Sequence, residues 1–501
     1  MLARLESAAV VGIEAAPVHI EVDLSFGLPR FQLVGLPDTS VKESRDRVHA
    51  AIRNSGLEFP QHRIVVNLAP ADLPKAGAAF DLPIALGILA AGGCLPERDL
   101  HDVVVVGELA LDGTIHAARG VLPVAVAARQ RQAAALLLPT ANMAEAAVVE
   151  GLRLLPVATL ADAVAVLNQP REHWPAPCAP EPAVARAPDA HLDLADLRGQ
   201  AFARRAVEIA AAGGHNLLLI GPPGAGKTML ARRLPSILPP LSFDEALEAT
   251  AIHSVAGLIP PGGGLLAERP FRAPHHTVSD AALVGGGSRP RPGEVSLAHH
   301  GVLFLDELPE FERRVLDALR QPLEEGRITV SRALRSVVFP ARFMLVGAMN
   351  PCPCGYKAHP ARACICTPAQ VARYGARLSG PLRDRIDLIV EVESVPIASL
   401  DEGPSGEASA DVRTRVLAAR ATQVARQGGL NAQLAGRGLQ RHGAVDARGR
   451  TLLQQSAERL HLSARAYHRV MRVARTIADL GGSGSVRAPA VAEALQYRFV
   501  G

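Results

Sequence analysis

One short glycine-rich segment constrains the fold of this chain more than any other feature. It follows an apolar run at residues 216–220 and precedes a helix-compatible stretch that starts at residue 229. Its glycines let successive backbone N–H groups curl around a phosphate, its lysine reaches the β and γ oxygens, and its threonine can hold Mg²⁺. The predicted nucleotide-binding residues are Gly221, Pro222, Pro223, Gly224, Ala225, Gly226, Lys227 and Thr228. The order of strand, loop and helix predicts a nucleoside triphosphate site in an α/β fold.

A second apolar run, at residues 301–305, ends in the adjacent acids Asp306 and Glu307. A buried parallel strand presents such acids at its carboxyl end. We expect Asp306 to join the Mg²⁺ shell and Glu307 to polarise the attacking water. Two neighbouring acids after an apolar run are often only a helix cap. Their position after a phosphate loop favours the catalytic interpretation.

Length and composition set the outer limits. With 501 residues and 48% apolar content, two or three domains with buried cores are expected. No charged-then-apolar leader opens the sequence, and the longest apolar runs are too short to span a bilayer, so we expect a cytoplasmic protein. The net charge of +4 is too small to indicate nucleic-acid binding by itself. Only 3% of residues are aromatic, which argues against a base-stacking surface.

Four of the six cysteines are clustered, while Cys94 and Cys178 stand alone and fit incidental thiols. The clustered ones form two Cys-x-Cys pairs, Cys352 with Cys354 and Cys364 with Cys366. In a reducing compartment such a cluster favours a metal over a disulfide, and tetrahedral zinc is the leading interpretation. The spacing is tighter than in the usual knuckle, so free thiols or a redox pair remain open.

The pattern along the chain predicts four parts. Residues 1–165 alternate strand-like and helix-like segments and predict a compact α/β domain. Residues 166–190 become rich in Pro and Ala, which favours an extended linker. Residues 191–395 hold the nucleotide motifs, and residues 396–501 predict a helical domain. The clearest individual elements are strands at 18–24 and 64–68 and helices at 40–54, 82–91 and 463–480.

Long sequence blocks carry a family resemblance. Residues 214–241, 271–311, 344–355 and 378–388 resemble the ComM/YifB group of AAA+ ATPases, which are relatives of the magnesium-chelatase ATPase subunit. The resemblance covers nearly the whole chain. It implies a core with a parallel sheet and hairpin inserts, a carboxyl-terminal helical lid, ATP and Mg²⁺ as ligands, and a ring of subunits, expected to be a hexamer.

The resemblance also assigns catalytic roles. Asn350, at the end of an apolar run, matches the sensor that orients the hydrolytic water, although an Asn-Pro turn would use the same residue. Arg385 matches the arginine finger offered in trans to a neighbouring subunit. Family members usually carry Leu where Arg383 stands. This sequence therefore has a second arginine two positions before Arg385, and Arg385 is the preferred candidate for the finger.

Arg465 matches the sensor arginine of the lid, which responds to the γ-phosphate. Three further arginines lie beside it at helical spacing, and the simplest expectation for them is a solvated basic face. They are Arg469, Arg472 and Arg475.

Two insertions in the sequence contain candidate residues for DNA contact. Residues 259–293 resemble the insert in helix 2 of related motors, and residues 328–338 alternate like a hairpin. In related rings both face the central pore, where arginines would grip phosphates without reading sequence. Taken singly, exposed arginines are mostly just solvated. The candidates for DNA contact are Arg327, Arg332 and Arg335, with Arg289 and Arg291 in the other insert.

Two pairs of adjacent histidines, His275-His276 and His299-His300, raise the question of a metal. Neighbouring side chains on a regular element point in different directions, which favours packing or supporting roles over metal binding.

Residues 67–81 and 107–113 resemble the catalytic domain of Lon-type Ser-Lys proteases. The alignment puts Ala79 where the nucleophilic serine belongs and Leu122 where the lysine belongs. A Ser-Lys pair needs both groups. We therefore expect a proteolytically inactive domain, retained for ring assembly or substrate contact.

The resemblance implies a ring ATPase that moves along DNA as a translocase or helicase. It points to branch migration of recombination intermediates during integration of incoming DNA in natural transformation, with sequence-independent DNA binding and recombination proteins as partners. One alternative is the ATPase motor of a magnesium-chelatase-like complex, which would need separate large subunits and ordinarily lacks the Lon-like domain and the Cys-x-Cys loops. A protein-remodelling or proteolytic ATPase is the other alternative, and Ala79 and Leu122 weaken its proteolytic form.

Overall fold

The chain forms two compact units. The computed structural model describes residues 1–75, 77–95, 99–178, 192–287, 290–332, 335–357, 359, 362–394 and 406–498. The first unit joins Met1–Val184 to Phe243–Leu266, and the second joins Ala185–Ser242 to Ala267–Gly501. The assignment of Phe243–Leu266 to the first unit was not anticipated from the sequence. The predicted domain limits at residues 165, 190 and 395 remain predictions.

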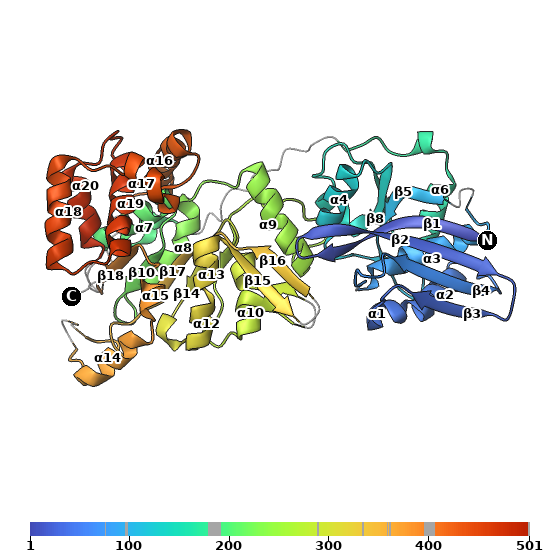
Figure 1. The fold of residues 1–501 in the computed structure, drawn as a ribbon, viewed down its shortest axis with the longest axis horizontal. Helices are drawn as coiled ribbons and strands as arrows, with labels where there is room; N and C mark the ends of the chain where they lie inside the picture. The colour runs from blue at the N-terminus through green and yellow to red at the C-terminus, as the bar shows by residue number, and fades with distance from the viewer. Residues whose placement is uncertain are drawn as a thin grey trace. The chain divides into compact units, whose positions relative to one another are not determined.

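A seven-stranded mixed sheet organises the first unit, in the order β3-β4-β2-β1-β5-β8-β9 (Figure 1). β2 pairs antiparallel with β1 and β4, and the other neighbours are parallel. The strands at 18–24 and 64–68 are confirmed within β2 and β4. The strands are β1 (Leu2–Val11), β2 (Glu14–Ser25), β3 (Arg30–Val34), β4 (Arg63–Ala69), β5 (Asp99–Val105), β8 (Ala135–Pro139) and β9 (Leu154–Val157), and a separate ribbon holds β6 (Glu108–Leu109) and β7 (Ile115–His116).

The helices of the first unit bury apolar side chains against this sheet. α3 is buried along its whole length, as expected for a helix packed on β1 and β2. Trp174, inside the predicted linker, is 6% exposed and belongs to the same core, while residues 179–191 lie outside the described residues. The helices are α1 (Thr39–Lys42), α2 (Ser44–Asn54), α3 (Asp81–Ala91), α4 (Val121–Gln130), α5 (Met143–Ala146), α6 (Leu160–Asn168) and α9 (Phe243–Ala256).

The second unit is built on a five-stranded parallel sheet in the order β11-β14-β17-β10-β18 (Figure 1). β10, β14 and β17 are buried along their whole length, which explains why they read as continuous apolar runs. The expected parallel core is confirmed. Its strands are β10 (Leu217–Ile220), β11 (Phe271–Arg272), β14 (Val302–Leu305), β17 (Met344–Met349) and β18 (Leu388–Glu391).

Helices surround this sheet and dominate the carboxyl-terminal region, as expected. The helices in the same stretch of chain as the strands of the sheet are α7 (Ala201–Gly213), α8 (Lys227–Ile237), α10 (Asp280–Val284), α11 (Glu294–Leu297), α12 (Arg313–Ala318), α13 (Arg320–Glu325), α14 (Pro368–Ala376) and α15 (Gly380–Arg383). Toward the end of the chain follow α16 (Ser409–Gln427), α17 (Gly436–His442), α18 (Ala447–Arg459), α19 (Ala464–Leu480) and α20 (Ala488–Gln496). No helix in the described ranges is both long enough and apolar enough to cross a membrane.

The expected hairpin is present. β15 (Arg327–Arg332) and β16 (Arg335–Pro340) pair antiparallel, with Arg332 opposite Arg335 at one end and Arg327 opposite Pro340 at the other. The arginine candidates for DNA contact therefore fall at opposite ends of the hairpin. A smaller ribbon pairs β12 (Gly285–Gly286) with β13 (Arg291–Pro292), and Arg289 lies outside the described residues.

The expectation of a solvated basic face on α19 is wrong. Arg475 is 2% exposed and its guanidinium lies 2.7 Å from Asp479. Arg469 lies 3.0 Å from the buried Asp387. Burial alone would raise the pKa of Asp387, but His215 and the charge of Arg469 hold it at about 2. Regular spacing cannot reveal this, because Asp387 comes from a distant part of the chain.

Candidate functional site

The predicted nucleotide residues converge at one edge of the parallel sheet. Lys227 follows β10, Asn350 follows β17 and Asp306 follows β14, which are neighbouring strands. The Lys227 Nζ atom donates to Asn350 Oδ1 at 3.1 Å. The Thr228 hydroxyl donates to Asp306 Oδ2 at 2.7 Å. Because carboxyl ends of parallel strands share an edge, residues far apart in the sequence meet where ligands bind in such folds.

The phosphate loop needs its glycines for conformation and for space. Gly224 and Gly226 have positive φ angles of 78° and 82°, which glycine adopts without strain. Gly221 lies so close to the backbone after β18 that a Cβ there would be 2.3 Å from the Val392 carbonyl oxygen. The loop is therefore fixed between the helix that follows it and the neighbouring edge strand.

Lys227 is positioned as an internal cation of this loop. It is 8% exposed, and its Nζ atom donates to the carbonyl oxygens of Gly221 at 2.7 Å and Pro222 at 2.9 Å. Burial lowers the pKa of Lys227, and the carboxylates of Asp306 and Glu307 oppose that shift. A cation with two acids close by can neutralise phosphate oxygens and leave the acids for a metal and a water.

Glu307 is held in an unusual backbone conformation, with a φ of 51°, and its side chain is 58% exposed. Its Oε2 atom lies 3.2 Å from Nδ1 of His276. His276 follows β11, which pairs with β14, so the two side chains leave neighbouring strands at the same edge. The supporting role expected for this histidine pair fits that contact. The specific link to Glu307 was not visible in the sequence, because it needs the strand order.

Gln200 is a second residue that sequence reasoning missed. It has a positive φ of 51°, and its side-chain amide donates to the Ala225 carbonyl and to the Glu393 carbonyl at 3.2 Å. It therefore ties the phosphate loop to the segment after β18. No sequence motif marked Gln200 as part of this site.

The two finger candidates differ in exposure. The Arg385 side chain is 11% exposed, donates to the Pro381 carbonyl at 2.5 Å and forms an ion pair with Glu324. Burial lowers the pKa of Arg385, and the positive charges of Arg320, Arg465 and Arg469 add to that effect. Arg383 is exposed. Arg465, the predicted lid sensor, is exposed in the first turn of α19, and its positive charge contributes to the lowered pKa of Arg385.

The four clustered thiols lie together. The sulfur atoms of all four lie within 4.8 Å of one another, and they belong to Cys352, Cys354, Cys364 and Cys366. The residues predicted from spacing to share a metal are thus brought into one group. The His299 ring in the second histidine pair accepts the Arg342 N–H at 2.9 Å and is 1% exposed.

In the first unit, the two positions aligned with a Ser-Lys pair have joined an apolar cluster. Leu122 is fully buried in it and Ala79 packs against it. Leu247 and Ala251 of α9 pack against the same cluster. Neither a hydroxyl nor an amine is present at the two positions. We therefore still predict that the domain has no proteolytic activity.

Comparison with known proteins gives matches along the chain. Residues 193–400 match the family described as magnesium chelatase, subunit ChlI. Residues 20–142 match a family described as subunit ChlI of Mg-chelatase, and residues 406–498 match the carboxyl-terminal domain of that subunit.

Full-length relatives are also found. The competence protein ComM of Haemophilus influenzae is 48% identical, covering 99% of this chain and 97% of that protein. The uncharacterized protein YifB of Escherichia coli is 46% identical, covering 100% and 97%. The magnesium-chelatase 38 kDa subunit of Rhodobacter capsulatus is 30% identical over 152 residues, which are 27% of this chain and 43% of that subunit.

Proposed function

This chain belongs to the ComM and YifB family of magnesium-chelatase-like AAA+ ATPases, and we propose that it uses ATP hydrolysis to move along DNA. The observation that carries the ATP-hydrolysis part of this proposal is the convergence of Lys227, Asp306 and Asn350 at one edge of the parallel sheet. That edge supplies what phosphoryl transfer to water needs, namely a cation, a metal-binding acid and a polar amide.

The chain's own residues divide the work of hydrolysis. Backbone N–H groups of the loop and the Lys227 ammonium bind the phosphates of ATP. Thr228 and Asp306, already in contact, would hold Mg²⁺, which neutralises charge on the phosphate oxygens when bound. Glu307 would orient and polarise the attacking water, and Asn350 would help to position that water.

A ring of subunits, which we propose to be a hexamer, completes the site. Arg385 would stabilise the transition state on the neighbouring subunit, and Arg465 would contact the γ-phosphate from the lid region. For Arg385 to reach a neighbour, its ion pair with Glu324 must open. Arg383 is already exposed and is therefore the competing candidate.

Two observations support the proposal that DNA is the substrate. A full-length relative is named a competence protein, and the hairpin sets Arg332 opposite Arg335 at one end. We propose that these residues, with Arg327, grip phosphates of DNA regardless of sequence. The process we propose is branch migration of recombination intermediates during integration of incoming DNA, in the cytoplasm and together with recombination proteins.

A second candidate is the motor of a metal-insertion complex. The identity with the magnesium-chelatase 38 kDa subunit favours it. That similarity covers 27% of this chain, whereas the similarity to the competence protein covers 99%. A chelatase-like motor would respond to a protein partner and not to DNA, so one assay separates the two.

The test is steady-state ATP turnover with and without branched or single-stranded DNA at several salt concentrations. We expect DNA to stimulate turnover and the stimulation to fade as salt rises, because phosphate contacts release counterions. Turnover indifferent to every DNA would contradict the DNA motor and favour the chelatase-like candidate.

Three variants serve as controls in the same assay. Lys227→Ala should abolish turnover with and without DNA, since it removes the cation that binds the phosphates. Arg385→Ala and Arg383→Ala form a matched pair, and the finger is the one whose loss slows turnover by about 1,000-fold while ATP binding persists.

A further inference from the structure

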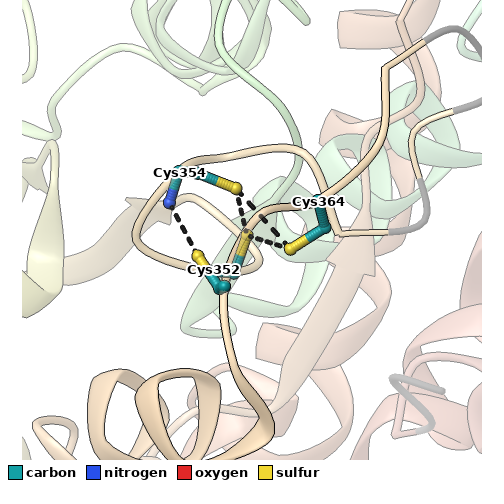
Figure 2. A group of neighbouring side chains, drawn as sticks. Cys352, Cys354 and Cys364 are labelled. Carbon is teal, nitrogen blue, oxygen red and sulfur yellow. Dashed lines mark hydrogen bonds between the residues drawn. The ribbon is translucent and has the colours of Figure 1, made fainter.

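The loop that follows Asn350 carries four cysteines whose sulfur atoms are spaced like metal ligands. Cys352 Sγ lies 3.4 Å from Cys354 Sγ and 3.6 Å from Cys364 Sγ, and the latter two are 3.6 Å apart (Figure 2). Disulfide-bonded sulfurs lie about 2.0 Å apart. Four thiolates at about 2.3 Å from a tetrahedral zinc ion lie about 3.8 Å apart. The three distances fit one face of such a tetrahedron, and the Cys366 sulfur lies within 4.8 Å of the other three.

Backbone N–H groups point at these sulfurs. The N–H of Lys357 donates to Cys352 Sγ at 3.3 Å, and that of Cys354 donates to Cys366 Sγ at 3.4 Å. Such donors stabilise thiolates and orient them toward a shared ion. Cys352 is fully buried, so its sulfur is held inside the loop and away from solvent oxidants.

The same loop is packed against the nucleotide machinery. Cys352 comes two residues after Asn350, whose side-chain oxygen accepts from Lys227. Gly355, with a φ of 85°, touches the phosphate loop so closely that a Cβ there would lie 2.6 Å from Pro223 Cδ. The loop of four cysteines therefore connects the residue predicted as a sensor to the loop that binds phosphate.

We propose that Cys352, Cys354, Cys364 and Cys366 bind one Zn²⁺, and that the zinc-closed loop braces Asn350 and the phosphate loop for hydrolysis. Zinc fits because four thiolates favour a tetrahedral ion without redox chemistry of its own. This bracing role rests on the proposed ATPase function, because the loop would act on the ATPase site. These cysteines act as positioning residues, because their thiolates would be held by the ion.

The first test is the metal content of the full-length protein, measured by elemental analysis after gel filtration. We expect about one zinc per chain in the unaltered protein and less than about one tenth of that in Cys354→Ser. Cys94→Ser is the matched control and should keep its zinc, because Cys94 lies outside the group. Absence of zinc from the unaltered protein, or full zinc in Cys354→Ser, overturns the site.

The second test addresses the brace. In protein loaded with Co²⁺ in place of zinc, the thiolate-to-metal absorption should change when a non-hydrolysable ATP analogue binds. In Gly355→Ala the new methyl group displaces Pro223, so turnover should fall by at least about tenfold while zinc content stays full. Full zinc shows that the variant has folded around the metal.

A cobalt spectrum indifferent to nucleotide, together with normal turnover in Gly355→Ala, overturns the brace. None of these measurements uses DNA. Failure of the DNA proposal, which is read from DNA stimulation, is therefore distinguishable from failure of the zinc proposal.

Discussion

Two glutamates, one in each unit, show how differently the two parts of this chain use a carboxylate. Glu145 in the first unit is 3% exposed and accepts from the Leu122 N–H at 3.0 Å, the Asn142 side-chain amide at 2.9 Å and the Ser254 hydroxyl. Glu307 in the second unit is 58% exposed, stands on a strained backbone and touches one imidazole.

The difference separates a carboxylate that holds structure from one that is free to react. Every donor around Glu145 belongs to the protein, so moving it would leave buried donors without partners. The Glu307 side chain is 58% exposed and follows β14 at the same edge of the sheet as Asp306. Burial and the number of hydrogen-bond donors thus distinguish the enclosed carboxylate from the accessible one better than residue type does.

Glu307→Gln should show the largest effect. The amide keeps the shape but cannot polarise water, so ATP turnover should fall by at least about 100-fold. ATP binding and thermal stability should stay unchanged, because the side chain is largely exposed. Turnover is measured by phosphate release and binding with a fluorescent ATP analogue. Retained turnover would mean that another group acts on the water.

Glu145→Gln is the matched variant in the first unit and should show the opposite pattern. Its amide group turns a donor toward existing donors, which costs about 2 kcal/mol in the free energy of unfolding. A scanning calorimetry transition should move down by about 5 °C, while turnover per folded molecule stays normal. An unchanged transition would show that the buried contacts around Glu145 contribute little.

His276→Ala should have the smallest effect. A single polar contact at a partly exposed site contributes up to about 1 kcal/mol, so the turnover number should fall by no more than about fivefold. KM for ATP should not change, because His276 acts through its contact with Glu307. His276→Asn should restore part of the loss through its own donor. A rise in KM instead would place His276 in nucleotide binding.

Much of the geometry of the candidate site could be predicted from the sequence because its motifs are local. Buried parallel strands have continuous apolar sequences. Such a run precedes the phosphate loop, the acids after β14 and the asparagine after β17. Their meeting at one edge then follows from the rule for parallel sheets. The hairpin was also predictable, because its alternation is a local signal.

The remaining features depend on pairings across long stretches of chain. His276 meets Glu307 only because β11 is placed beside β14. The arginines of α19 looked like a solvated stripe, and their acids, Asp387 and Asp479, are recognised only once the helix is packed. Gln200 acts through two backbone carbonyls, which leave no mark in a sequence.

The docking of α9 changes how the two units are joined. The chain passes between units at Val184–Ala185, again at Ser242–Phe243 and again at Leu266–Ala267. A single cut in the chain therefore releases neither unit. A fragment that ends before residue 243 would lack Leu247, Ala251 and Ser254, and would expose the apolar cluster and leave Glu145 short of a donor. The first unit is thus completed by a piece of sequence that follows the phosphate-loop helix.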